Sequence, residues 1–187
     1  MPITTLDPKT ALVVIDLQKG IVARAAAPAG AEVVQRASML ADAFRKRGLP
    51  VALVNVSAGA PGRTDQGAMT GAFPPDWTEL LPELNQQPSD ILVTKRTWGA
   101  FASTDLEKQI RALGVTQIVL CGISTSAGVE STARQAFEAG FNVTIATDAV
   151  TDMSPDAHQN SLARIFPRLS ETGTTADIIA KLGGAPA

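Results

Sequence analysis

Short apolar runs alternate along this chain with segments whose apolar residues recur every three or four positions. Runs rich in branched residues are typical of strands buried on both faces, and the three-to-four spacing is typical of helices that bury one face. The predicted strands are residues 10–16, 50–56, 91–94, 116–121, 142–147 and 168–172. The predicted helices are residues 31–47, 77–84, 103–113, 126–139, 154–167 and 174–182, and a Gly/Pro/Ala-rich loop is predicted at 57–75.

This order of elements predicts the fold class. Strands that alternate with helices form mostly parallel sheets through right-handed crossovers, with helices on both faces. We therefore expect a three-layer α/β/α, doubly wound, Rossmann-like fold with a six-stranded sheet. A chain of 187 residues with no internal repeat or linker predicts a single domain over residues 1–187.

Composition narrows the functional classes. The net charge is −2 and basic residues are dispersed, which does not favour a nucleic-acid partner. The N-terminal segment lacks the features of a signal peptide, and no apolar stretch approaches the ~20 residues that span a bilayer. We expect a cytoplasmic protein that does not bind membranes.

Metal and nucleotide sites are also disfavoured. One cysteine and one histidine cannot supply a disulfide, a thiolate cluster or a zinc site with two or three histidines. The phosphate-binding glycine motifs are absent as well. The sequence therefore predicts neither a metal nor another cofactor.

Polar residues stand just beyond three predicted strands: Asp16, Lys95 and the Ser124–Thr125 pair. In a doubly wound sheet, strands one and four are neighbours and ligands bind at their carboxyl ends. Asp16 and Lys95 would form a partly desolvated pair there, in which each changes the protonation of the other. Taken singly, Asp16 could cap a backbone amide and Lys95 could be solvated. Together they predict a site.

A serine hydrolase is an alternative. Residues 122–126 approach the G-x-S-x-G nucleophile motif but lack its second glycine, and Asp148 and His158 follow Ser124 in the order found in α/β-hydrolases. The competing interpretation is that the hydroxyls belong to a turn and His158 to a helix surface. Cys121 ends an apolar strand, so burial is the simpler interpretation and a nucleophilic role the alternative.

Aromatic side chains follow Lys95 in the sequence. Trp98 and Phe101 flank the segment after Lys95 and could line an apolar pocket over the site. Packing of one subunit against another is the other interpretation.

Three blocks of sequence carry a resemblance to a known family. They are residues 13–18 (Val-Val-Ile-Asp-Leu-Gln), 94–106 and 119–133, and Asp148–Ala149 also fits. In this order and at this spacing, the chain resembles the isochorismatase-like hydrolases over nearly its whole length. The resemblance implies a six-stranded parallel sheet, a homodimer or homotetramer, and hydrolysis without a cofactor.

Most members of that family use an Asp, a Lys and a Cys, with the Cys in the pattern G-x-x-T-x-x-C-V-x-x-T-A. Gly128 occupies the cysteine position here, as in the true isochorismatases. The matching positions of the pattern are Gly122, Thr125, Val129, Thr132 and Ala133. Without a thiolate, the acyl-enzyme route of the amidases in the family has no nucleophile.

The resemblance then implies vinyl-ether hydrolysis of a small anionic substrate. Asp16 would be the general acid, Lys95 would orient it, and Gly128 would complete the catalytic set. Desolvation would raise the pKa of Asp16 and Lys95 would lower it, and the sequence leaves open which effect is larger. A catalytically silent member that binds a metabolite is a further alternative.

The remaining expectations concern substrate contacts. The predicted substrate-binding residues are Gln18, Trp98, Phe101, Ser124, Thr125 and Ala127. The family also places a cis peptide between residues 123 and 124. Isochorismatases have Ala-His before the glycine, where this chain has Ser126 and Ala127, and a glutamine where this chain has Val56. The sequence therefore leaves open a substrate other than isochorismate.

Overall fold

The fold of the computed structural model is built on a six-stranded sheet, and the structure describes residues 2–26, 28–65, 67 and 73–184. The strand order is β3-β2-β1-β4-β5-β6, and every adjacent pair is parallel. The strands are β1 (Thr10–Ile15), β2 (Val51–Val56), β3 (Ile91–Lys95), β4 (Gln117–Ile123), β5 (Asn142–Thr151) and β6 (Glu171–Gly173). The predicted three-layer, doubly wound architecture is confirmed.

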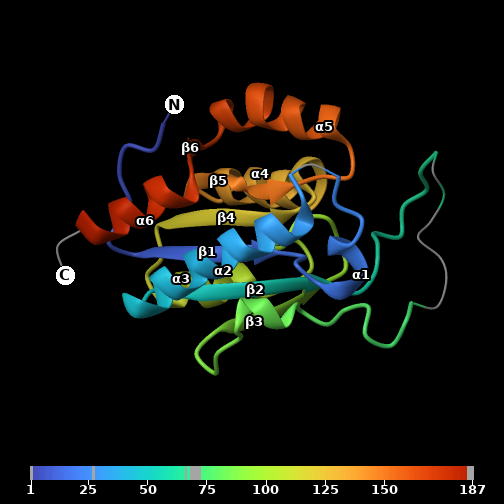
Figure 1. The fold of residues 1–187 in the computed structure, drawn as a ribbon, viewed down its shortest axis with the longest axis horizontal. Helices are drawn as coiled ribbons and strands as arrows, with labels where there is room; N and C mark the ends of the chain where they lie inside the picture. The colour runs from blue at the N-terminus through green and yellow to red at the C-terminus, as the bar shows by residue number, and fades with distance from the viewer. Residues whose placement is uncertain (1, 27, 66, 68–72, 185–187) are drawn as a thin grey trace.

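Helices cover both faces of this sheet (Figure 1). One layer contains α2 (Gly30–Lys46) and α6 (Thr175–Gly184), and the other contains α3 (Leu106–Ala112), α4 (Glu130–Glu138) and α5 (Pro155–Asn160). Side chains alternate along β1, so Leu12 and Val14 pack towards α2 while Val13 and Ile15 pack in the opposite core. Burial on both faces explains the uninterrupted apolar runs of the central strands.

Several predicted helices differ from those in the structure. The predicted helix at 77–84 is wrong, because only Pro82–Leu84 forms a 3₁₀ turn. Leu81 is extended, as is usual for a residue that precedes proline. Between Lys19 and Val22 a short helix, α1, forms where only a loop was expected.

Other elements begin or end at different residues from those predicted. The helix expected at 126–139 starts as a π-helical turn, Thr125–Val129, which continues into α4. The helix expected at 154–167 is α5 followed by a π-helical turn and a 3₁₀ turn that ends at Arg168, so β6 begins only at Glu171. Strand β5 runs on to Thr151 through an irregularity in its pairing with β4. The predicted loop at 57–75 contains no helix or strand in its described part, and 66 and 68–72 lie outside the described residues.

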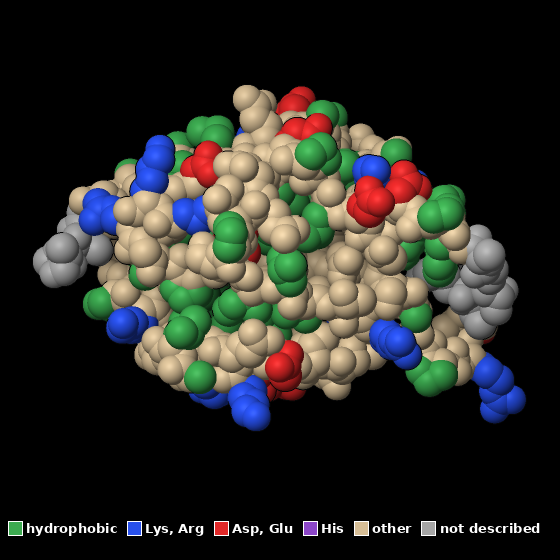
Figure 2. Space-filling model, turned by 90° about the horizontal axis from the view of Figure 1, so that it is seen from below, with side chains coloured by type: hydrophobic (Ala, Val, Ile, Leu, Met, Phe, Trp, Pro, Cys, Tyr) green, Lys and Arg blue, Asp and Glu red, His purple; other side chains and the backbone are tan. Residues whose placement is uncertain are grey.

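The surface carries charges of both signs. On the face shown in Figure 2, Lys and Arg side chains are interspersed with Asp and Glu, and hydrophobic side chains lie between them. The β3 edge strand exposes Leu92. Within the described part of the chain, no helix combines the length and the apolar character that a membrane span requires.

Candidate active site

The carboxyl ends of three strands bring together the polar residues that the sequence singled out. Asp16 follows β1, Lys95 is the last residue of β3, and Ser124 follows β4. β1 pairs with both β2 and β4, and the sheet order reverses at β1/β4, the position where doubly wound folds bind ligands. The expected convergence of these residues at one edge of the sheet is observed.

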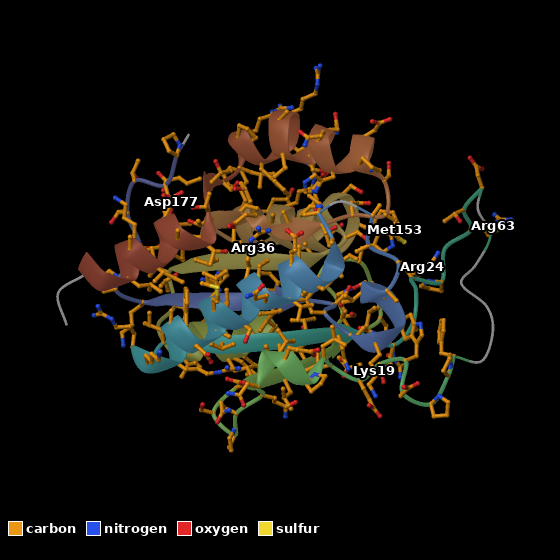
Figure 3. All side chains as sticks on the ribbon, in the orientation of Figure 1. Lys19, Arg24, Arg36, Arg63, Met153 and Asp177 are labelled. Atoms are coloured by element: carbon orange, nitrogen blue, oxygen red, sulfur yellow. The ribbon has the colours of Figure 1, made fainter. Side chains whose placement is uncertain are left out.

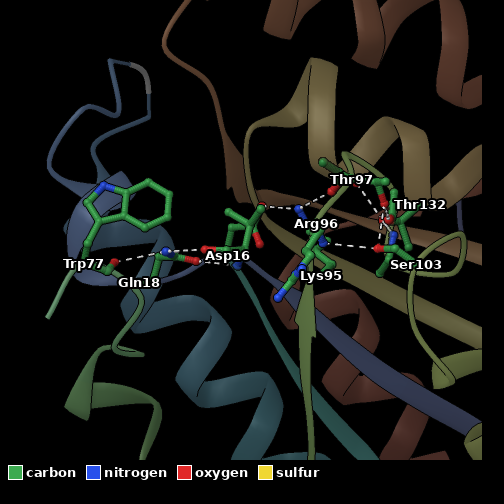
Figure 4. Close-up of polar contacts among 12 residues, drawn as sticks. Asp16, Gln18, Trp77, Lys95, Arg96, Thr97, Ser103 and Thr132 are labelled. Atoms are coloured by element: carbon green, nitrogen blue, oxygen red, sulfur yellow. Dashed lines mark hydrogen bonds and ion pairs between the residues drawn. The ribbon is translucent and has the colours of Figure 1, made fainter. Parts of the chain in front are cut away.

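Asp16 and Lys95 form a buried ion pair. Lys95 Nζ lies 2.7 Å from Asp16 Oδ2 and donates a second hydrogen bond to the carbonyl oxygen of Thr97 at 3.1 Å. The two residues are only 5% and 1% exposed. Figure 4 shows the pair with Gln18 and Trp77 on one side and Thr97, Ser103 and Thr132 on the other. The lysine ammonium is therefore held at one oxygen of the carboxyl group.

The other carboxyl oxygen has no partner. Asp16 Oδ1 is buried and makes no hydrogen bond with any described residue. The backbone of Asp16 has a φ of 52°, in the left-handed region that non-glycine residues seldom adopt. Such conformations concentrate at functional sites, where the surrounding structure enforces them. Asp16 thus combines an unusual backbone with an unused acceptor.

Burial decides the protonation of Asp16. Desolvation raises its pKa from 3.8 to about 6, and the attraction and hydrogen bond of Lys95 offset only part of that rise. Desolvation is therefore the larger of the two opposing effects left open by the sequence. A carboxyl group with this pKa holds a proton in an appreciable fraction of molecules near neutral pH.

Gly128 leaves space beside this carboxyl group. A Cβ atom at Gly128 would lie 3.0 Å from Ile15 Cγ2 and 3.2 Å from Asp16 Oδ2. The Gly128 carbonyl accepts a hydrogen bond from Thr132 Oγ1 at 2.7 Å, which ties the π-helical turn to α4. The peptide bond between Ile123 and Ser124, just before this turn, is cis. The family resemblance places a cis peptide at the same position.

A cavity of about 220 Å³ opens over these groups. Six of the residues predicted for the site line it: Asp16, Trp98, Lys95, Ser124, Ala127 and Gly128. Four further lining residues, Arg24, Phe73, Trp77 and Met153, were not predicted. Arg24, Phe73 and Met153 lie outside the predicted helices and strands, and Trp77 begins the helix predicted at 77–84, so the pattern of elements did not indicate a common site.

Gln18 was predicted to bind substrate, and that prediction is wrong. Its side chain is fully buried and its amide is used by the backbone. Oε1 accepts from the Val56 N–H at 2.8 Å, and Nε2 donates to the carbonyls of Val56 and Trp77 at 3.1 and 3.0 Å. Gln18 thus joins the end of β2 to the segment before β3 and does not line the cavity.

Phe101 and Thr125 also lie away from the cavity. Phe101 packs against Phe141 with ring centroids 5.9 Å apart, in the core beneath α3 and α4. Thr125 is fully buried, and its Oγ1 lies 2.8 Å from Nδ1 of His158. The prediction that they contact substrate is therefore wrong, because each side chain turns into the protein.

The structure does not assemble a serine-hydrolase relay. His158 pairs with Thr125, and Asp148 Oδ1 accepts from N and Oγ1 of Thr175 at 2.7 and 2.9 Å. The irregularity in β5 lies at Asp148, which contacts α6 rather than the cavity. Burial also lowers the pKa of His158, against the opposing charge of Asp152. Ser124 lines the cavity without a hydrogen bond to a base among the described residues.

Cys121 is a core residue. It is fully buried among apolar side chains of the α2 layer. Burial, reinforced by the charge of Asp148, raises the pKa of its thiol far above the usual range, so the reactive thiolate does not form readily. Within the residues that the structure describes, no group of three or more His, Cys, Asp or Glu side chains could hold a metal ion.

The chain is similar to known proteins over nearly its whole length. The isochorismatase domain family matches residues 10–177. The chain is 46% identical over 178 residues to the uncharacterized isochorismatase family protein YwoC of Bacillus subtilis, covering 91% of this chain and 93% of that protein. A solved isochorismatase family protein from Burkholderia thailandensis superposes with a TM-score of 0.92 at 45% identity, covering 96% of this chain and 98% of the other.

Weaker similarity reaches relatives with named activities. A probable isochorismatase of Pseudomonas chlororaphis is 25% identical over 94% of this chain and 87% of its own length. A ureidoacrylate amidohydrolase of Rhizobium rhizogenes is 30% identical over 86% of this chain and 77% of its own length. The relatives therefore include a protein named as a probable isochorismatase and one named as an amidohydrolase.

Proposed function

The chain belongs to the isochorismatase family of hydrolases, and we propose that it hydrolyses a vinyl ether in a small anionic substrate with Asp16 as the general acid. One observation carries the proposal. Asp16 lines the cavity, the pKa of its carboxyl group is raised to about 6, and its buried Oδ1 atom has no hydrogen-bond partner among the described residues. A carboxyl group in this state can donate a proton to a weakly basic carbon.

The reaction follows from the two carboxyl oxygens. Lys95 occupies Oδ2, so the proton resides on Oδ1. The proton passes to the methylene carbon of the enol ether, whose π electrons form the new C–H bond, and the ether oxygen stabilises the resulting oxocarbenium ion. Water adds to this cation and returns a proton to Asp16. The hemiketal then breaks its C–O bond as its hydroxyl proton moves to the departing oxygen, giving a ketone and an alcohol.

Lys95 acts on Asp16 in two ways. Its ammonium fixes the orientation of the carboxyl group, and it stabilises the carboxylate that remains after proton transfer. The lysine is itself oriented by the Thr97 carbonyl, and Thr97 Oγ1 contacts Gly99 O and Ser103 Oγ at 2.9 and 3.0 Å. The segment after β3 therefore sets the position of the acid.

An ether fits the cavity better than an amide. Amide cleavage by covalent catalysis needs an activated nucleophile, and Gly128 supplies no side chain at the family position. Ser124 is the one hydroxyl residue among the described residues that line the cavity, and it lacks a neighbouring base. Protonation of carbon requires an acid and a water molecule only, which agrees with the groups present.

The test is pyruvate release from isochorismate by the wild-type chain and by Asp16→Asn. We expect the substitution to lower kcat about 10³-fold, since a general acid contributes typically 10²–10⁴-fold. Because the protonated acid is the active form, kcat/KM in the wild type should fall as pH rises above about 6. The variant must retain the circular dichroism spectrum of the wild type.

Three outcomes would contradict the proposal. Full activity in Asp16→Asn would remove the acid from the mechanism. Labelling of the wild type by a fluorophosphonate, lost in Ser124→Ala and retained in Asp16→Asn, would favour the serine mechanism. A panel of vinyl ethers, amides and esters that all remain unreacted would favour a silent, metabolite-binding member.

A further inference from the structure

The cavity contains a positive charge that the proposed chemistry does not use. Its charged lining residues are Asp16, Lys95 and Arg24. Asp16 and Lys95 are paired with each other, whereas the exposed side chain of Arg24 makes no hydrogen bond or ion pair with any residue that the structure describes. Lys19, on the helix just before Arg24, differs because Asp76 and Glu79 bind it at 3.4 and 2.6 Å. Arg24 is therefore available to a ligand.

The backbone around Arg24 is held to the site. Its N–H donates to the carbonyl of Ile21 at 2.9 Å, directly after α1. Two residues later, the Ala26 N–H donates to the carbonyl of Asp152 at 2.9 Å, which ties this segment to the residue before Met153. Figure 3 shows Arg24 and Met153 at the same end of the molecule, with Arg63 farther out on the loop after β2. Arg24 thus lines the cavity from a segment whose backbone is held by hydrogen bonds.

Aromatic side chains form the walls between these groups. The rings of Phe73 and Trp77 stack with centroids 4.1 Å apart and an angle of 21°. Trp77 lies so close to the backbone of Gly20 that a Cβ atom there would overlap the indole. Trp98 lines the same cavity and is 63% exposed. Flat aromatic faces suit a planar or nearly planar ring of a ligand.

The volume limits the size of that ligand. Sites for drug-sized molecules span about 300–1,000 Å³. The cavity here has about 220 Å³, which suits a single ring with a few substituents and excludes a nucleotide. Its remaining lining residues are mostly apolar, so a charged group of the ligand has one unpaired counterpart among the described residues, Arg24.

We propose that Arg24 is a specificity-determining residue that binds a carboxylate on the ring portion of the substrate, while the aromatic walls hold the ring. This inference rests on the proposed function, because it places the ring carboxylate away from the enol ether that Asp16 protonates. A guanidinium matches a carboxylate with two parallel hydrogen bonds, which a neutral amide in the same place cannot reproduce.

Intrinsic fluorescence provides a direct test. The chain has two tryptophans, Trp77 and Trp98, and both line this cavity. Titration with benzoate and with benzamide compares a charged and a neutral ligand of the same shape. In the wild type we expect benzoate to bind about tenfold more tightly, as a charge-assisted hydrogen bond at a partly exposed site provides. Added salt should reduce that preference.

Variants locate the charge responsible. Arg24→Met should bring benzoate to the affinity of benzamide and leave benzamide binding unchanged, which shows that the cavity remains intact. Arg24→Lys should restore part of the preference. Arg63→Met removes an exposed positive charge from a residue that does not line the cavity, so it should behave as the wild type. With a turned-over substrate, Arg24→Met should raise KM with kcat little changed, because the contact is the same in the ground and transition states.

The outcomes separate this inference from the proposed function. A benzoate preference that depends on Arg24 supports the inference even if no vinyl ether is cleaved. Equal binding of benzoate and benzamide by the wild type, or a preference that survives in Arg24→Met, overturns it even if cleavage requires Asp16. Loss of benzamide binding in Arg24→Met would also overturn it, because Arg24 would then support the cavity and not the charge.

Discussion

Two acid–base pairs in this protein, one buried and one half-buried, differ in how many of their carboxyl oxygens are hydrogen-bonded. At the turn before β3, Asp90 accepts from Nε and the terminal nitrogen of Arg45 at 3.1 and 2.8 Å and from the Gln87 N–H at 2.8 Å. Both of its carboxyl oxygens are used. At the other end of β3, Asp16 pairs with Lys95 through one oxygen and leaves the second without a partner. The first pair joins elements, and the second leaves one carboxyl oxygen without a partner among the described residues.

The difference follows from the groups that face each carboxyl group. A guanidinium and a backbone amide can together engage both carboxyl oxygens, whereas an ammonium behaves as a point charge at one of them. The incomplete pairing leaves the desolvation of Asp16 only partly compensated, which raises its pKa to about 6. The comparison can be tested at either pair.

The largest effect on stability should come from pH at the Asp16 pair. A pKa raised from 3.8 to about 6 corresponds to about 3 kcal/mol. Because the folded protein holds this proton more tightly than the unfolded chain, the contribution is fully present below pH 3.8 and is lost as pH rises through about 6. Urea unfolding of the wild type and Asp16→Asn from pH 4 to 7 should therefore show the wild type losing stability relative to the variant. Parallel pH curves would contradict the raised pKa.

Breaking the Asp90 pair should lower the free energy of unfolding and leave activity unchanged. Asp90→Asn places an amide nitrogen or a neutral oxygen against the Arg45 guanidinium, so we expect a loss of about 2 kcal/mol in the free energy of unfolding. Activity should be unchanged, because this pair lies at the opposite end of β3 from the cavity. Urea unfolding and kcat/KM measured on the same preparation check both parts. A loss of activity in the folded variant would show that the two pairs are coupled.

The smallest expected effect on stability comes from a substitution beside Asp16. Gly128→Ala would place a Cβ atom 3.2 Å from Asp16 Oδ2 and 3.0 Å from Ile15 Cγ2, so the carboxyl group must shift by a few tenths of an ångström. We expect kcat/KM to fall about tenfold, because small displacements of reacting groups are costly, while stability changes by about 1 kcal/mol or less. Gly62→Ala is the matched control, since a Cβ there meets open space. Equal activity in both variants would show that the gap at Gly128 is not needed.

The sequence predicted the convergence of the site but not its full lining. Asp16, Lys95 and Ser124 were predictable because each follows or ends a buried strand, and strand ends at a switch point meet. Gln18 lies in the same family-like block of sequence as Asp16 and was predicted to bind substrate. Its position alone did not reveal that its side-chain amide forms hydrogen bonds with the backbone N–H and carbonyl of Val56 at the end of β2.

Arg24, Phe73 and Trp77 could not be assigned from local patterns. They belong to segments whose positions depend on tertiary contacts, such as the Ala26–Asp152 hydrogen bond and the close packing of Trp77 on Gly20. Asp148 shows the reverse case. It was expected at a strand end, but an irregularity in β5 extends the strand and directs Asp148 to Thr175.

Periodicity along the chain by itself determined the strands, the layers and the end of the sheet where the candidate site lies. The burial of alternating or helical positions is set by near neighbours in the sequence. Only the tertiary structure decided that Asp16 is partly protonated, that one of its oxygens is unpaired, and that a free guanidinium stands at the cavity. These properties depend on how much water is excluded and which atoms meet across distant segments. Neither is encoded in the spacing of residues within any one segment.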